Sequence, residues 1–61
     1  MNAVWHEHFF VPGGGELDRF DAVEYEDGSI WVVDIRASQR ARCYSREFAA
    51  AAANALAKAK P

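Results

Sequence analysis

Asp27-Gly28 is the sequence feature that most limits what this chain can fold into. The dipeptide lies between two runs of mixed apolar and polar residues, 19–26 and 29–36. A two-residue type I′ turn needs positive φ at both central positions, and Asp-Gly is one of the pairs that adopt it most readily. We therefore predict a β-hairpin in which Glu26 pairs with Ser29, with the pairing continuing outward to Arg19 and Arg36.

This register decides which side chains share a face of the hairpin, because alternate residues of a strand point to opposite sides. One face would carry the apolar side chains of Phe20, Ala22, Trp31, Val33 and Ile35. The other would carry Val23, Tyr25, Ile30 and Val32, bordered by Arg19, Asp21, Asp34 and Arg36. Asp21 would lie directly opposite Asp34, and like charges in that position destabilise a sheet by up to about 1 kcal/mol.

Two further segments can extend the sheet. Residues 4–11 are rich in aromatic and β-branched side chains and stop at Pro12 and three glycines, which predicts a strand followed by a flexible loop. The glycines lack the spacing and the Lys-Ser/Thr pair of a phosphate-binding loop. Residues 37–44 remain open between a loop and a fourth short strand from Arg40 to Tyr44.

A helix is predicted over residues 46–59. Ser45 is a suitable N-cap, Glu47 suits the positive end of the helix dipole, and the alanine run has the best intrinsic helix propensity. Lys58 suits the negative end, and Pro61 lies beyond it. The apolar stripe expected to face the sheet consists of Phe48, Ala52, Ala55, Leu56 and Ala59.

These elements predict an α+β fold in one small domain spanning residues 1–61, with three or four antiparallel strands packed on the helix. The helix should cover the face that holds Trp31, together with Trp5, Phe9 and Val11 from the first strand. Since one helix covers only one side of a sheet, the opposite side must meet solvent, a second copy or a partner. A chain of this length buries only about 60% of the surface that its unfolded form exposes, so its core is small.

Features that the sequence lacks limit the cellular compartment and the kind of chemistry that can be expected of the protein. A single cysteine, Cys43, cannot form an internal disulfide, no run approaches the roughly 20 apolar residues of a membrane helix, and no signal peptide is evident. We expect a cytoplasmic protein. No nucleophile, base and orienting group occur in a catalytic context, so neither an enzyme nor a cofactor is expected. His6 and His8 share a strand face, but a zinc site would need further ligands.

Charge is divided unevenly along the chain, although the net charge is only −2. Residues 1–35 hold eight carboxylates and one arginine, whereas residues 36–61 hold six basic residues and one carboxylate. Such asymmetry concerns partners and association rather than fold. Carboxylates shown in rows on a twisted sheet could compete electrostatically for a basic groove that otherwise holds phosphates.

In its size, acidity and sheet-plus-helix pattern the chain resembles the small anti-CRISPR proteins of phages and mobile elements. The resemblance implies an inhibitor that acts as a steric block or DNA mimic on a basic nucleic-acid-binding protein. The most direct target would be the DNA-binding subunit of a type I CRISPR complex in a bacterial host. The residues expected to bind this protein partner are Asp21, Glu24, Tyr25, Glu26, Asp27 and Asp34.

Two other functions compete with this one. The strand-turn-strand-helix order, with Asp27-Gly28 and an alanine-rich helix, also resembles the arm-binding domains of phage and transposon integrases. That resemblance implies DNA binding by the arginines between Arg36 and Arg46. Those domains need a basic sheet, however, whereas this hairpin carries most of the carboxylates, so we do not expect direct nucleic-acid binding. Alternatively, the uncovered sheet face pairs with a second copy of the chain in a homo-oligomer.

Overall fold

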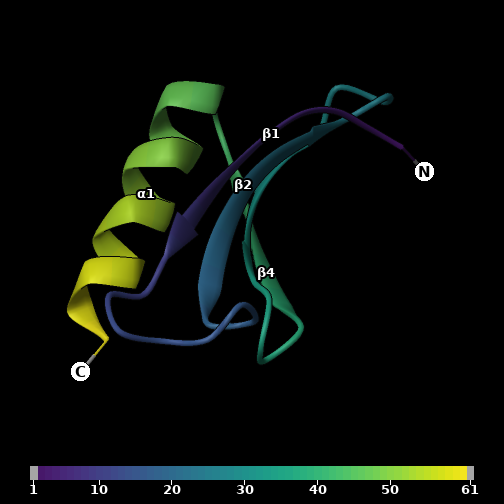
Figure 1. Ribbon diagram of the computed structural model, residues 1–61. Helices are drawn as coiled ribbons and strands as arrows, with labels where there is room; N and C mark the ends of the chain where they lie inside the picture. Colours follow the sequence, from purple (N-terminus) through teal and green to yellow (C-terminus); the bar gives the residue numbers. More distant parts are fainter. Residues whose placement is uncertain (1, 61) are drawn as a thin grey trace.

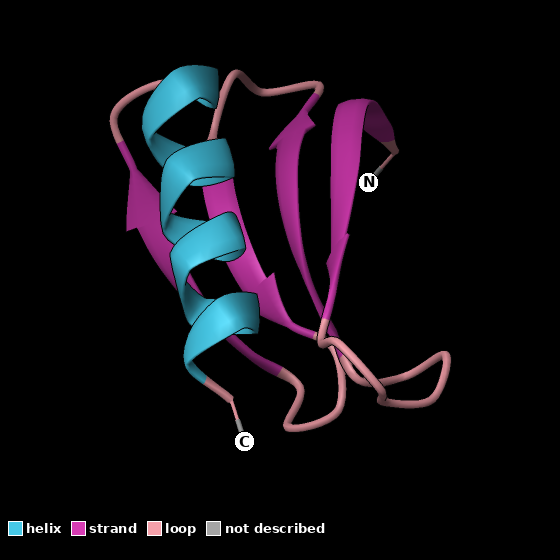
Figure 2. Cartoon of the chain, turned by 60° about the vertical axis from the view of Figure 1, so that its left-hand side comes forward, coloured by secondary structure: helices cyan, strands magenta, loops and turns pink. Residues whose placement is uncertain are grey.

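A four-stranded antiparallel sheet packed against one C-terminal helix forms the chain in a computed structural model, which describes residues 2–60. The elements are β1 (Ala3–Phe10), β2 (Arg19–Tyr25), β3 (Ile30–Asp34), β4 (Gln39–Cys43) and α1 (Arg46–Ala59). Figure 1 shows the helix along one side of a curved sheet, and Figure 2 shows it crossing in front of the strands. The predicted α+β class is confirmed. Pro61, expected after the helix, lies outside the described residues.

Each strand pairs with its neighbours in sequence, so the sheet order is β1-β2-β3-β4 and the outer strands are its edges. The stretch after residue 36 therefore forms a strand, because Gln39–Cys43 pairs antiparallel with Asp34–Ile30. The glycine loop between β1 and β2 is closed by the amide of Val11, which donates to the Asp18 carbonyl oxygen at 2.8 Å.

The turn between β2 and β3 differs from the predicted type I′ turn. The Gly28 amide donates to the Tyr25 carbonyl and the Tyr25 amide to the Ser29 carbonyl, both at 2.9 Å, so three residues form the loop. Only Gly28 has positive φ there, at 86°. The Asp27 carboxylate accepts from both the amide and the hydroxyl of Ser29, at 2.9 and 2.6 Å, which stabilises this turn without requiring a strained aspartate.

The longer turn shifts the register by one residue, so the predicted pairing was wrong. Glu24 pairs with Ile30 instead of Trp31, and Asp21 pairs with Val33 instead of Asp34. A shift of one residue turns every side chain of β3 to the opposite side of the sheet. The predicted Asp21–Asp34 pair therefore does not form, and Trp31, expected in the core, lies on the side away from α1.

The core forms between the helix and the side of the sheet that carries Phe20 and Ala22. Its buried members are Val11, Phe20, Ala22, Val32, Ala49, Ala53 and Ala57, with Trp5, Phe9, Ile30, Cys43 and Ala50 packed against them. The prediction that Trp5, Phe9 and Val11 join this side is confirmed. Ile30 and Val32 were expected on the uncovered side, but the register shift brings them to the helix.

The helix begins and ends as predicted, yet it presents a different face to the sheet. The Ser45 hydroxyl caps it by accepting from the Phe48 amide at 3.1 Å. Ala49 and Ala53 are fully buried, whereas Phe48 and Leu56 of the predicted stripe are 53% and 45% exposed. Methyl side chains allow the helix backbone to approach the strands closely, and the larger residues are left at its margin.

Candidate functional site

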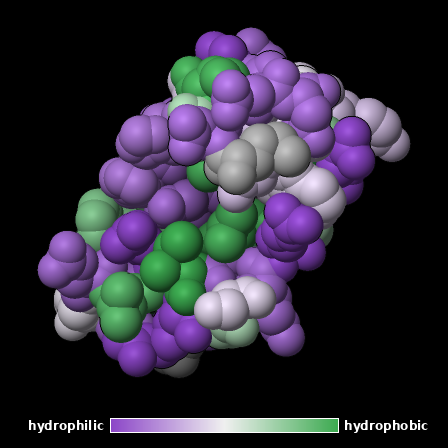
Figure 3. Space-filling view, turned by 90° about the vertical axis from the view of Figure 1, so that its right-hand side faces the viewer, coloured by the Kyte–Doolittle hydropathy of each residue, from purple (hydrophilic) through white to green (hydrophobic). Residues whose placement is uncertain are grey.

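The side of the sheet turned away from α1 is covered by no other helix or strand of residues 2–60, and we call it the open face. Its two complete cross-strand rows are His6-Val23-Trp31-Arg42 and His8-Asp21-Val33-Arg40. By the same alternation Phe10, Arg19 and Tyr25 extend the face at its ends. Figure 3 looks onto this side and shows a hydrophobic strip between hydrophilic side chains. The face therefore combines apolar, aromatic and basic groups.

Two arginines from β4 gather around the indole ring of Trp31. The guanidinium carbon of Arg40 lies 4.0 Å from the ring centroid and that of Arg42 lies 5.3 Å from it. Cation–π contacts of this kind contribute about 0.5–1 kcal/mol each where they are exposed. Both arginines are exposed, and within residues 2–60 neither forms an ion pair. Their guanidinium groups thus remain available to an anion.

A hydrogen-bond relay fixes the orientation of this indole. Trp31 Nε1 donates to the Ser29 hydroxyl at 2.9 Å, and that hydroxyl donates to the Asp27 carboxylate at 2.6 Å. The bonds from Ser29 lower the pKa of Asp27 below its ordinary value of 3.8, so the carboxylate accepts as an anion at neutral pH. A hollow of about 270 Å³ adjoins the indole, lined by Tyr25, Asp27, Ser29, Trp31 and Arg40.

The β1 side of the open face carries three rings in succession. The His6 and His8 rings lie 4.9 Å apart, and the His8 and Phe10 rings 6.2 Å apart, between centroids. The Phe10 ring is 54% exposed even though the Arg19 guanidinium lies 5.9 Å from its centroid. Exposed rings in a row offer flat surfaces to another planar group.

Asp21 is the one carboxylate in these rows, and its charge is engaged within the protein. It is 5% exposed, it accepts from Arg19 Nε at 3.1 Å, and its Oδ1 lies 2.8 Å from His8 Nδ1. Burial of a carboxylate is tolerated when such donors satisfy it. Three arginines, Arg19, Arg40 and Arg42, therefore leave the open face with an excess of positive charge.

The residues predicted to bind a protein partner do not form one surface. Asp21 and Tyr25 lie on the open face, Glu26 and Asp27 lie in the turn at its end, and Glu24 and Asp34 alternate onto the helix side. Because the register differs from the predicted one, the rows of carboxylates expected across the hairpin are absent from the described structure.

Two ion pairs also join the acidic half of the chain to the basic half. Arg46 Nε donates to Glu24 at 2.5 Å on the helix side, and Arg36 Nε donates to Asp18 at 2.5 Å near the glycine loop. These ion pairs therefore bring together some of the opposite charges that are separated along the sequence. The basic groups on the open face are not among those neutralised by these pairs.

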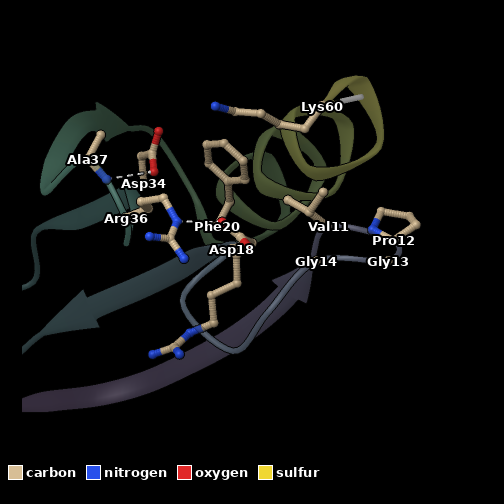
Figure 4. Close-up of a pocket in the computed structure, with 11 residues that line it drawn as sticks. Val11, Pro12, Gly13, Gly14, Asp18, Phe20, Asp34, Arg36, Ala37 and Lys60 are labelled. Atoms are coloured by element: carbon tan, nitrogen blue, oxygen red, sulfur yellow. Dashed lines mark hydrogen bonds and ion pairs between the residues drawn. The ribbon is translucent and has the colours of Figure 1, made fainter.

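A larger cavity lies elsewhere, beside the glycine loop and the end of α1, and has a volume of about 410 Å³. In Figure 4, Arg36 reaches Asp18 and Lys60 extends over Phe20. The hydrogen bond from Arg36 lowers the pKa of Asp18 below 3.8, with a further contribution from the Gly15 amide, and raises that of Arg36. The polar side chains here chiefly bond to the protein itself, and the lining includes no serine, cysteine or histidine.

Arg40 and Arg42 were considered from sequence as part of a basic segment, but their association with Trp31 was not predicted. The alternation Gln39-Arg40-Ala41-Arg42-Cys43 was the available signal, since a period of two places both arginines on one face of a strand. The wrong register placed Trp31 in the core and so concealed the cluster.

Neither a metal site nor a membrane-crossing helix is found among residues 2–60. No three His, Cys, Asp or Glu side chains of this range are grouped so that they could hold a metal ion. His6 and His8 do lie side by side, as their spacing predicts, but the carboxylate of Asp21 contacts only His8 of the two and is engaged with Arg19 as well. No helix in the same range has both the length and the apolar character needed to cross a bilayer.

Comparison with known proteins gives no match: no family model, no curated protein and no solved structure matches the chain. The geometry and charge of the open face are therefore the basis on which a function can be assigned.

Proposed function

We propose that this protein binds nucleic acid through the open face of its sheet. The observation that carries the proposal is the cluster of the half-buried Trp31 with the exposed Arg40 and Arg42, on a face that no other helix or strand of residues 2–60 covers. Guanidinium groups recognise phosphate oxygens through paired hydrogen bonds, and exposed rings or guanidinium planes provide surfaces for bases. One cluster therefore offers both kinds of contact that a nucleic acid requires.

The charge distribution supports the same function. Arg19, Arg40 and Arg42 outnumber Asp21 on the open face, and Asp21 already accepts from Arg19 and contacts His8. Glu24 and Asp34 point to the other side of the sheet, so their charges do not adjoin this surface, whereas the ionised Asp27 lies at its turn end, in the hollow that Arg40 also lines. Screening over about 8–10 Å in physiological salt weakens repulsion from the more distant carboxylates.

A salt titration tests the proposal directly. Fluorescence anisotropy of a labelled oligonucleotide should show binding at low salt that weakens as salt is added. For single strands, the logarithm of the binding constant falls against that of salt concentration by about 0.7 for each phosphate neutralised. Contacts from Arg40 and Arg42 predict a slope of at least about 1.4. Absence of binding by micromolar protein in low salt would contradict the proposal.

The carboxylates of the turn between β2 and β3 favour a second candidate function. Glu26 and Asp27 are exposed at the turn, and hydrogen bonds from Ser29 favour the ionised form of Asp27. These charges support the proposal of an anti-CRISPR inhibitor that binds a basic, DNA-binding subunit in the host cytoplasm. The same assay separates the two functions, because such an inhibitor would displace an oligonucleotide from the basic protein without binding the free oligonucleotide itself.

A further inference from the structure

We infer that the open face binds single-stranded nucleic acid in preference to a duplex. This inference rests on the proposed function and adds the form of nucleic acid that the face accepts. Three observations carry it: the breadth of the sheet, the row of rings on β1, and the position of the unpaired arginines at the opposite edge.

The breadth of the sheet does not suit the grooves of a duplex. Neighbouring strands lie about 4.8 Å apart, so the outer backbones of four strands are separated by about 14 Å before side chains are counted. The major groove of B-DNA is only about 12 Å wide and admits a helix or a two-stranded ribbon. The complete rows, which run from His6 to Arg42 and from His8 to Arg40, cannot enter that groove together.

The exposed rings on β1 favour a ligand with unpaired bases. In a duplex the faces of the bases are stacked on one another, whereas a single strand leaves them free to stack on aromatic side chains. His6, His8 and Phe10 follow one another along β1 with their rings 4.9 and 6.2 Å apart. Phe10 is 54% exposed, and its apolar ring gains more from a base than from a phosphate.

The two arginines that form no ion pair within residues 2–60 lie at the opposite edge of the open face from the rings. Arg40 and Arg42 belong to the edge strand β4, while the rings belong to the opposite edge strand β1. Val23 and Trp31 lie between them in one row, and Asp21 and Val33 in the other. A single strand running along β4 would place its phosphates on the arginines and extend its bases across the apolar strip toward β1. The face thus separates backbone contacts from base contacts, as an unpaired strand requires.

The test compares three labelled ligands of one mixed sequence: single-stranded DNA, single-stranded RNA and duplex DNA. We expect one or both single strands to bind on the order of tenfold more tightly than the duplex, since stacking of a base or two can supply that difference. A preference for one single strand identifies which sugar the face accepts. Equal or tighter duplex binding would overturn this inference while leaving the proposed function standing, and no binding to any of the three would overturn both.

A matched pair of variants tests the role of the rings. Phe10→Leu removes a 54% exposed ring from the open face, and Phe48→Leu removes a 53% exposed ring from the helix. Phe10→Leu should weaken single-strand binding about fivefold and change duplex binding little, because only the single strand stacks on it. Phe48→Leu should leave both unchanged. Equal effects of the two substitutions, or no effect of Phe10→Leu, would contradict base stacking on β1.

Discussion

Replacing Arg40 and Arg42 together by glutamine should weaken oligonucleotide binding at least tenfold at low salt. The salt slope should also fall by about 1.4, because two phosphate contacts are lost. Both side chains are exposed and form no ion pair among residues 2–60, so the fold should persist, with a lower melting temperature from the loss of two cation–π contacts to Trp31. Circular dichroism and thermal unfolding can verify that, and fluorescence anisotropy in a series of salt concentrations measures the loss.

The matched control removes two positive charges from elsewhere. Lys58 and Lys60 are exposed at the end of α1, and neither belongs to the open face. The Lys58→Gln, Lys60→Gln double variant changes the net charge by the same amount, but it should bind nearly as well as the unmodified chain. If both double variants lost affinity equally, binding would depend on overall charge and not on the cluster at Trp31.

Replacing Ala53 by leucine should cause the largest loss of stability of any change considered. Ala53 is fully buried against the sheet, and added methylene groups in a packed core usually cost about 1–3 kcal/mol. For a domain of this size each kcal/mol lowers the melting temperature by about 4–8 °C. The expected fall is therefore roughly 5–20 °C, and a marginal domain could unfold altogether. Thermal unfolding followed by circular dichroism measures it.

Ala51 provides the control for this substitution, because it lies in the same helix but is exposed. Ala51→Leu adds the same atoms and should change the free energy of unfolding by no more than about 0.5 kcal/mol. Equal effects at positions 51 and 53 would show that α1 does not pack through Ala49, Ala53 and Ala57. The pair of variants therefore tests the helix orientation independently of any ligand.

The kinds of element, and the bounds of the helix, could be predicted from sequence because their signals are local. Ser45 has the side chain of an N-cap, and the alanines that follow have no competing preference. The alternating residues of β2 and β3 likewise predicted strands. These features depend on residues close to one another in the chain.

The register could not be predicted because two turns compete for the same residues. Asp27-Gly28 suits a two-residue type I′ turn, but Ser29 donates to the Asp27 carboxylate and stabilises a three-residue turn instead. A difference of one residue then decides whether Trp31 or Val32 faces the helix. The error therefore extended from one turn to the core, the open face and the candidate site.

The helix face could not be predicted because the alanine run contains more than one apolar stripe. Size alone suggested that Phe48 and Leu56 mark the buried side. The sheet instead accepts the stripe of Ala49, Ala53 and Ala57, whose small side chains permit close approach. Which stripe packs depends on the shape of the surface it meets, and that shape follows from the β3 register.

The two indole groups allow the most direct test of binding at the open face. Trp31 lies on that face, whereas Trp5 packs beside the core on the helix side. Their Nε1–H signals can be followed in a nitrogen–proton correlation spectrum while a single-stranded oligonucleotide is added. We predict that the Trp31 signal shifts and saturates while the Trp5 signal stays nearly unchanged. A shift confined to Trp5, or no shift of Trp31 when the oligonucleotide is bound, would contradict nucleic-acid binding at the open face.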